Sequence, residues 1–156
     1  MYIGGLTPIS LLVEQIAKRL GEIVMKYDLT QVQLNPPAES EVVGRLSKSL
    51  GFSLPESYID FLQNHNGGEG FIGDNYIILW AVEELADFNR EYEVATYAPG
   101  VFLFASDGGG EGYGFDLEDA AMPIVRLPFI GMERQYAERV AGNLPELFTR
   151  LADSDE

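Results

Sequence analysis

Residues 54–70 read LPESYIDFLQNHNGGEG and predict a helix followed by a reversal of the chain. Leu54-Pro55 is typical of a helix start, because proline already has a helical φ angle and its missing N–H needs no partner in the first turn. A buried stripe follows at helical spacing: Tyr58, Ile59, Phe61 and Leu62. Asn66-Gly67 ends the helix with a residue suited to positive φ, and we expect residues 67–70 to form a turn.

A hairpin and another helix are expected next along the chain. Phe71-Ile72 and Tyr76–Leu79 are short apolar runs separated by Gly73-Asp74-Asn75, which is the pattern of a hairpin. A helix is predicted from about Val82 to Tyr92, before Pro99-Gly100.

The strongest strand signal lies in the second half of the chain. Val101–Ala105 is continuously apolar, which favours a central strand that is covered on both faces. Tyr113–Leu117 alternates and Pro123–Leu127 follows, so both are expected to continue the same meander. A last helix is predicted after Asn143, with Pro145 in its first turn.

The first third of the chain is expected to be mostly helical. An amphipathic helix is predicted from Thr7-Pro8 to about Lys26, and a second one over Ala38–Leu50, closed by Gly51. Asp28–Pro37 is polar and is expected to be an irregular connector.

These elements predict an α+β fold, in which a mostly antiparallel sheet packs against several helices. The length of 156 residues favours one domain over residues 1–156. We expect residues 1–35 to hold the N-terminal helix and connector, residues 36–151 the core, and residues 152–156 an acidic tail.

Charge is distributed unevenly along the sequence. The net charge is -15, and residues 49–125 contain 14 acidic residues but only one basic residue, Arg90. Such a field repels phosphate backbones and anionic lipid surfaces, so we expect neither nucleic acid nor membrane as a partner. A basic protein, in contrast, would be attracted.

The residue types present do not assemble a known catalytic or metal site. The chain has no Cys and a single His, His65, so thiolate metal sites and cysteine nucleophiles are excluded. The loop Asp107–Gly112 resembles a phosphate or calcium loop only faintly, because it lacks the Gly-Lys-Ser/Thr ending and the flanking helices. We expect no cofactor and no enzymatic activity, although a carboxylate- or metal-dependent hydrolase stays an alternative.

No stretch has the basic and apolar pattern of a signal peptide or the length of a membrane span, so a cytoplasmic protein is expected.

The order of these motifs resembles the SUKH superfamily, which is named for fungal Smi/Knr cell-wall regulators and includes related bacterial proteins. The resemblance rests on Leu54-Pro55, Tyr58, Phe61-Leu62 and Asn66-Gly67-Gly68, in that order. It continues through the glycine-and-acid hairpin after Val101, the Pro123–Val125 strand and the closing helix, and so covers residues 36–151. Residues 141–144, AGNL, match the family pattern before the last helix more loosely.

The resemblance implies a non-enzymatic protein-binding domain, and bacterial members are implicated as immunity proteins that neutralise a toxin. Many such toxins are basic nucleases, which an acidic domain would attract. We therefore expect an immunity protein with a basic toxin as its partner, and a regulatory scaffold of the Smi/Knr type is the alternative. The expected contact residues are Glu69, Asp74, Asp107, Glu111, Tyr113 and Asp116. The oligomeric state is left open.

Overall fold

The computed structural model describes residues 12–13 and 27–153. In this part of the chain seven strands form one sheet in the order β1-β2-β3-β4-β5-β6-β7, and every pair is antiparallel. The strands are β1 (Val32–Leu34), β2 (Gly68–Ile72), β3 (Asn75–Leu79), β4 (Val101–Ser106), β5 (Glu111–Asp116), β6 (Ile124–Pro128) and β7 (Glu138–Ala141). The helix expected over residues 7–26 lies outside the described residues, apart from Leu12 and Val13.

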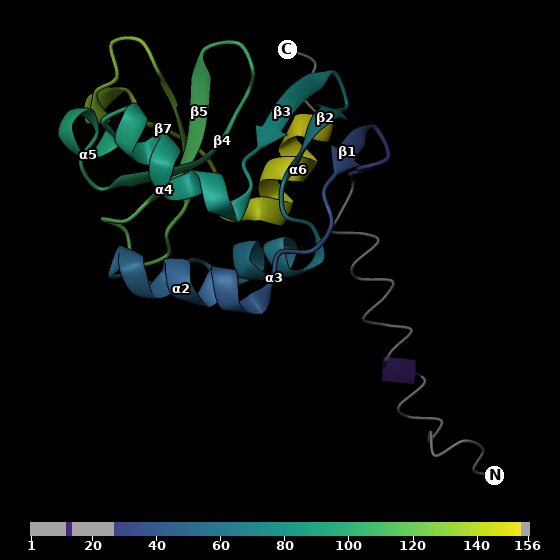
Figure 1. The fold of residues 1–156 in the computed structure, drawn as a ribbon. Helices are drawn as coiled ribbons and strands as arrows, with labels where there is room; N and C mark the ends of the chain where they lie inside the picture. The colour runs from purple at the N-terminus through teal and green to yellow at the C-terminus, as the bar shows by residue number, and fades with distance from the viewer. Residues whose placement is uncertain (1–11, 14–26, 154–156) are drawn as a thin grey trace.

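Helices cover the sheet from several sides (Figure 1). They are α2 (Ser40–Leu50), α3 (Glu56–Asn64), α4 (Val82–Glu91), α5 (Val94–Tyr97) and α6 (Leu144–Asp153), with a 3₁₀ turn at Arg134–Tyr136. The α4 helix contacts β4, α6 contacts both β2 and β7, and α2 and α3 pack together along one side. The predicted α+β class is confirmed, because the helices pack around a single antiparallel sheet.

The core is centred on β4, as the apolar run at residues 101–105 predicts. Every residue of β4 is buried, and the strand lies fourth of seven in the sheet. Phe104 stacks on Phe115 with ring centroids 4.5 Å apart, and the ring of Tyr58 from α3 lies 5.2 Å from both. The stretch at residues 54–62 therefore supplies the helix that packs against the middle of the sheet.

Three segments differ from the expected pattern. Residues 67–70 were expected to form a turn, but Gly68 and Gly70 belong to β2. The connector at residues 28–37 contains the short strand β1, and the sequence analysis did not predict β7. For residues 67–70 the physical reason is that glycine permits tight turns and also lets two backbones approach closely.

The predicted capping residues are confirmed at the end of α2 and the start of α6, whereas α3 ends at Asn64, before the expected Asn66-Gly67. Gly51 has a φ angle of 77° directly after α2, and the side chain of Asn143 accepts a hydrogen bond of 2.9 Å from the backbone N–H of Glu146. The four apolar residues expected on the inner face of the last helix are all buried: Leu144, Leu147, Phe148 and Leu151. Helix α6 runs on through Asp153, two residues into the segment expected as a tail.

The hydroxyl of Tyr58 predicts an unusual response to mutation. It is fully buried, has no hydrogen-bond partner among the described residues, and burial raises the pKa of its phenol well above the ordinary value. A buried polar group without a partner keeps its desolvation cost, so we expect Tyr58→Phe to raise the free energy of unfolding by about 1 kcal/mol. Urea denaturation measures the change, with Tyr58→Leu, which removes the ring contacts, as the destabilised control. A loss of stability in Tyr58→Phe would show that the hydroxyl has a partner.

Candidate functional site

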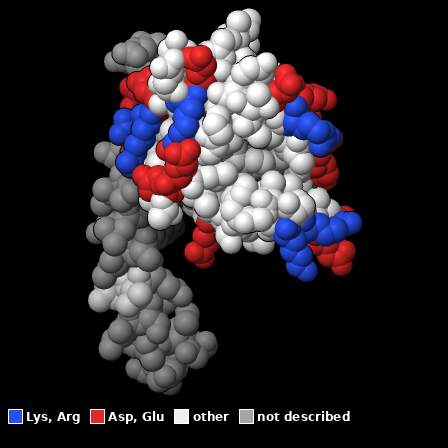
Figure 2. Space-filling model, turned by 90° about the vertical axis from the view of Figure 1, so that its left-hand side faces the viewer, with Lys and Arg blue, Asp and Glu red and all other residues white. Residues whose placement is uncertain are grey.

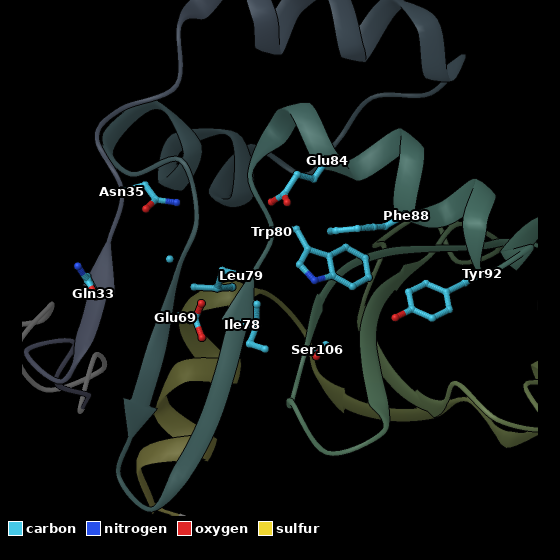
Figure 3. A pocket seen from close by; sticks show the side chains of 11 residues that line it. Gln33, Asn35, Glu69, Ile78, Leu79, Trp80, Glu84, Phe88, Tyr92 and Ser106 are labelled. Carbon is cyan, nitrogen blue, oxygen red and sulfur yellow. The ribbon is translucent and has the colours of Figure 1, made fainter.

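A groove of about 560 Å³ lies between the outer face of strands β2 and β3 and the helix α4 (Figure 3). We call it the β2–α4 groove. Gln33, Asn35 and Glu69 form one wall, and Ile78 and Ser106 lie at its base. Trp80 and residues of α4 form the opposite wall. Within the described part of the chain, no Lys or Arg lines the groove.

Strand alternation places Glu69 in the groove. Gly68, Gly70 and Ile72 face inwards and are buried, so Glu69 and Phe71 point to the other side of β2. The two glycines allow β1 to pack closely: a Cβ at Gly70 would lie 2.1 Å from the carbonyl oxygen of Gln31. The glycine-rich run therefore holds β1 against β2 and presents the Glu69 side chain on the open face.

The opposite wall is aromatic. The ring centroids of Trp80 and Phe88 lie 4.8 Å apart, in an edge-to-face arrangement. The ring of Tyr92 is nearly parallel to both neighbouring rings, with its centroid 6.3 Å from that of Trp80 and 4.4 Å from that of Phe129. Trp80 is only 6% exposed, as expected of a core residue, but its indole nitrogen faces the open space of the groove in Figure 3. Tyr92 is 41% exposed, so the wall offers apolar surface to a ligand.

Hydrogen bonds hold the carboxylates around the groove. The hydroxyl of Tyr76 donates to Glu69 Oε2, and this hydrogen bond raises the pKa of the Tyr76 phenol. Glu84 accepts a hydrogen bond of 3.0 Å from the backbone N–H of Ala81 at the start of α4. Glu83 accepts one of 2.7 Å from the side-chain amide of Asn66. These carboxylates have fixed positions, and none has a Lys or Arg partner among the described residues.

The six expected contact residues do not form one cluster. Asp74 lies in the β2–β3 turn, and Asp107 and Glu111 flank the β4–β5 loop. In an antiparallel meander these two connections lie at the same end of the sheet. Asp116 lies at the other end of β5, roughly 16 Å from Glu111 by strand geometry. Glu69 is the one of the six that lines the β2–α4 groove.

Arginines from later in the chain neutralise two of the expected residues. Arg126 Nε lies 3.5 Å from Glu111 Oε2, and Arg126 Nη2 lies 3.8 Å from Glu138 Oε2. Arg134 Nη2 lies 2.7 Å from Asp116 Oδ1. Figure 2 shows acidic and basic side chains next to each other around the border of one face, whose centre carries no charged side chain. The charge segregation along the sequence is therefore partly cancelled in space on this side.

Asp107 and Tyr113 have structural roles within the hairpin. The Asp107 carboxylate accepts hydrogen bonds from the backbone N–H groups of Gly109 at 2.7 Å and Glu111 at 3.1 Å, which orders the loop. Tyr113 is only 3% exposed, and burial raises the pKa of its phenol. The expectation that Tyr113 is a surface anchor does not fit this burial, so we leave it out of the contact surface.

Sequence reasoning missed the groove residues Trp80, Phe88 and Tyr92. A signal was present, because Glu84, Phe88 and Tyr92 follow one another at a spacing of four and so lie on one face of a helix. That stripe adjoins the buried face, because Leu85 and Tyr92 are seven residues apart and point in nearly the same direction. Aromatic residues along the border of the buried face extend the apolar surface of the helix beyond the core.

Neither a cluster of metal ligands nor a membrane-spanning helix is found among the described residues. Among residues 12–13 and 27–153, no three His, Asp or Glu side chains are placed to hold a metal ion. In the same part of the chain, no helix has both the length and the apolar character to cross a membrane.

Comparison with known proteins identifies the family. No curated protein matches the chain. The sequence model of the SMI1 / KNR4 family (SUKH-1) matches residues 37–150, which is almost the same segment as the resemblance to the SUKH superfamily covers. This match includes the helices α2 and α3, the strands β2–β7 and most of α6. Because it covers well over half of the 156 residues, the chain belongs to the SMI1 / KNR4 family (SUKH-1).

Proposed function

We propose that this chain is a non-enzymatic, cytoplasmic immunity-type protein that binds and neutralises a basic toxin, of the nuclease class. Members of the SMI1 / KNR4 family act in protein–protein interactions, and the family is generally non-catalytic. The proposal commits to one partner chemistry, a protein with a cationic surface, and to one surface, the side of the molecule that holds the β2–α4 groove.

The observation that carries the proposal is the uneven compensation of charge. Arg126 on β6 and Arg134 in the 3₁₀ turn before β7 each pair with two carboxylates. In the groove, Glu69 and Glu84 have no basic partner among the described residues, and neither does Glu83, the neighbour of Glu84 at the start of α4. Some of the carboxylates that give the chain its net charge of -15 therefore lie, without basic partners, on the side that also exposes aromatic surface.

This combination suits fast and tight protein binding. Carboxylates without an internal partner steer a cationic surface towards the groove and raise the association rate. Aromatic side chains that lose contact with water then supply most of the affinity. A basic toxin held in this way would have its cationic, nucleic-acid-binding face covered.

The functional test is co-expression with the product of the neighbouring reading frame. We expect that product to arrest growth when expressed alone and growth to recover when this chain is expressed with it. A complex on a pull-down supports the mechanism. Absence of rescue, or a partner that is not toxic, would contradict the immunity proposal, and the latter result would favour the regulatory scaffold.

A charge-matched comparison tests where the toxin binds. The triple variant Glu69→Gln, Glu83→Gln, Glu84→Gln removes the two charges that line the groove and the neighbouring charge of Glu83 on α4, and we expect it to slow association about tenfold at low salt. The control removes three exposed charges on the α2–α3 side: Glu39→Gln, Glu41→Gln, Glu56→Gln. It has the same net charge, and we expect it to bind at close to the wild-type rate. Equal slowing in both variants would show that only net charge matters.

A further inference from the structure

In the centre of the β2–α4 groove, one side-chain polar atom of Glu69 and one of Trp80 make no hydrogen bond to other described residues. The Glu69 carboxylate is held through Oε2 by the Tyr76 hydroxyl, and no described residue donates a hydrogen bond to its Oε1. Figure 3 shows Glu69 and Glu84 on opposite sides of the open space, and the indole nitrogen of Trp80 faces the same space from the α4 side. Among the described residues, no acceptor lies within hydrogen-bond distance of that indole N–H.

We propose that the β2–α4 groove binds the side chain of an arginine presented by a protein partner. This inference rests on the proposed function and names the chemical group that the toxin would insert. The guanidinium has five N–H donors in a planar arrangement, which lets one group bind carboxylates on two walls. The groove supplies these carboxylates as Glu69 and Glu84.

The rest of an arginine side chain also fits the lining. Its methylene groups pack against Ile78 at the base and the exposed ring of Tyr92 on the wall. The indole N–H of Trp80 donates to a main-chain carbonyl of the same segment. A lysine has a compact charge at the end of its chain and pairs with one carboxylate at a time, so the groove favours arginine.

Charge complementarity selects this occupant over an anionic or neutral one. No Lys or Arg from the described residues reaches into the groove, so an anion would meet two carboxylates without compensation. A purely apolar side chain would bury the carboxylates without a partner, which costs free energy. A cation satisfies both constraints, and its aliphatic stem covers the aromatic wall.

The only tryptophan of the chain provides a local reporter. Because Trp80 lines the groove, its fluorescence is expected to change when the groove fills. The probe is the peptide acetyl-Gly-Ser-Arg-Ser-Gly-amide, titrated at low salt into the full chain. Matched peptides carry citrulline, which keeps the shape but not the charge, or lysine at the central position.

We expect saturable binding of the arginine peptide, and binding at least about tenfold weaker for the citrulline peptide. The Glu69→Gln variant is expected to bind the arginine peptide about tenfold more weakly than the wild type. Glu111→Gln is the matched control, since Glu111 already pairs with Arg126 outside the groove, and it is expected to bind like the wild type. Circular dichroism confirms that both variants are folded. Equal binding of the arginine and citrulline peptides, or no effect of Glu69→Gln, would overturn the inference.

The two proposals fail separately. If the chain rescues growth from the toxin but the arginine peptide does not bind, the groove inference is wrong and the immunity function stands. If the arginine peptide binds with the expected loss in Glu69→Gln but no toxin is neutralised, the groove inference is supported and the immunity function is wrong.

Discussion

Replacing Asn89 with alanine is expected to lower the free energy of unfolding by about 3 kcal/mol. Asn89 lies on α4, and its side chain bonds to both backbone groups of Leu103 in β4. The amide nitrogen donates to the carbonyl oxygen at 2.8 Å, and the amide oxygen accepts from the N–H at 2.8 Å. Leu103 is completely buried, so the variant leaves two buried backbone groups without a partner.

The sheet itself explains why a side chain is needed at this point. Strand β3 pairs with β4 only at Leu79↔Ala105 and Ile78↔Ser106, and the chain then turns away through Trp80 into α4. The side chain of Asn89 therefore makes the hydrogen bonds to Leu103 that the backbone of a longer β3 would make. It also donates to the carbonyl oxygen of Leu85 one turn earlier, which keeps its side chain in position.

Urea denaturation of purified protein measures the loss. The control is Asn64→Ala, because Asn64 donates one hydrogen bond to the carbonyl oxygen of Asp60 in an exposed position. We expect less than about 0.5 kcal/mol from the control, as is usual for exposed sites. A loss below 1 kcal/mol in Asn89→Ala would mean that water replaces the amide.

The second large effect is expected at Gly70, where alanine should lower the free energy of unfolding by about 3 kcal/mol. The added Cβ would lie 2.1 Å from the carbonyl oxygen of Gln31 and 2.7 Å from the Cα of Val32, and both atoms belong to backbone that cannot swing away. The φ angle of +155° adds strain for any residue with a Cβ. The strand β1 must move away, and the wall formed by Gln33 and Asn35 moves with it.

Two other glycines separate the causes of this loss. Gly44 lies inside α2 with open space around its Cβ position, so Gly44→Ala is expected to raise the free energy of unfolding by about 1 kcal/mol. Gly110 has a φ angle of +116° but also open space, so Gly110→Ala measures backbone strain alone, expected at about 1 kcal/mol. A loss at Gly70 no larger than that at Gly110 would show that β1 does not restrict the position.

The regular elements could be predicted because their signals are local. The apolar run at residues 101–105 and the helical spacing after Asn143 lead directly to β4 and α6. The strands β1 and β7 could not be predicted in this way. They are three and four residues long, and β7 is mostly exposed or half-buried, so neither has a hydrophobic pattern that differs from a loop.

The candidate site was predicted only in part, and Glu69 is the residue that sequence and structure share. It was predicted to be a contact residue because it lies in a glycine-rich, acidic stretch, although that stretch was expected to be a turn. The aromatic wall was missed, because Trp80 is 6% exposed and so is as buried as a core residue. Tyr113 was expected at the surface because acidic residues flank it in the sequence, but β5 is buried from Gly112 to Phe115.

The sequence by itself determined the helices α2, α3, α4 and α6, the central strand, the family and the excess of carboxylates over basic groups. Only the tertiary structure decided which carboxylates keep their charge uncompensated. Arg134 reaches back 18 positions to Asp116, whereas no basic side chain in the described residues reaches Glu69. The reason is physical: helical and strand patterns depend on near neighbours, but ion pairing depends on distance in space, which only the folded chain defines.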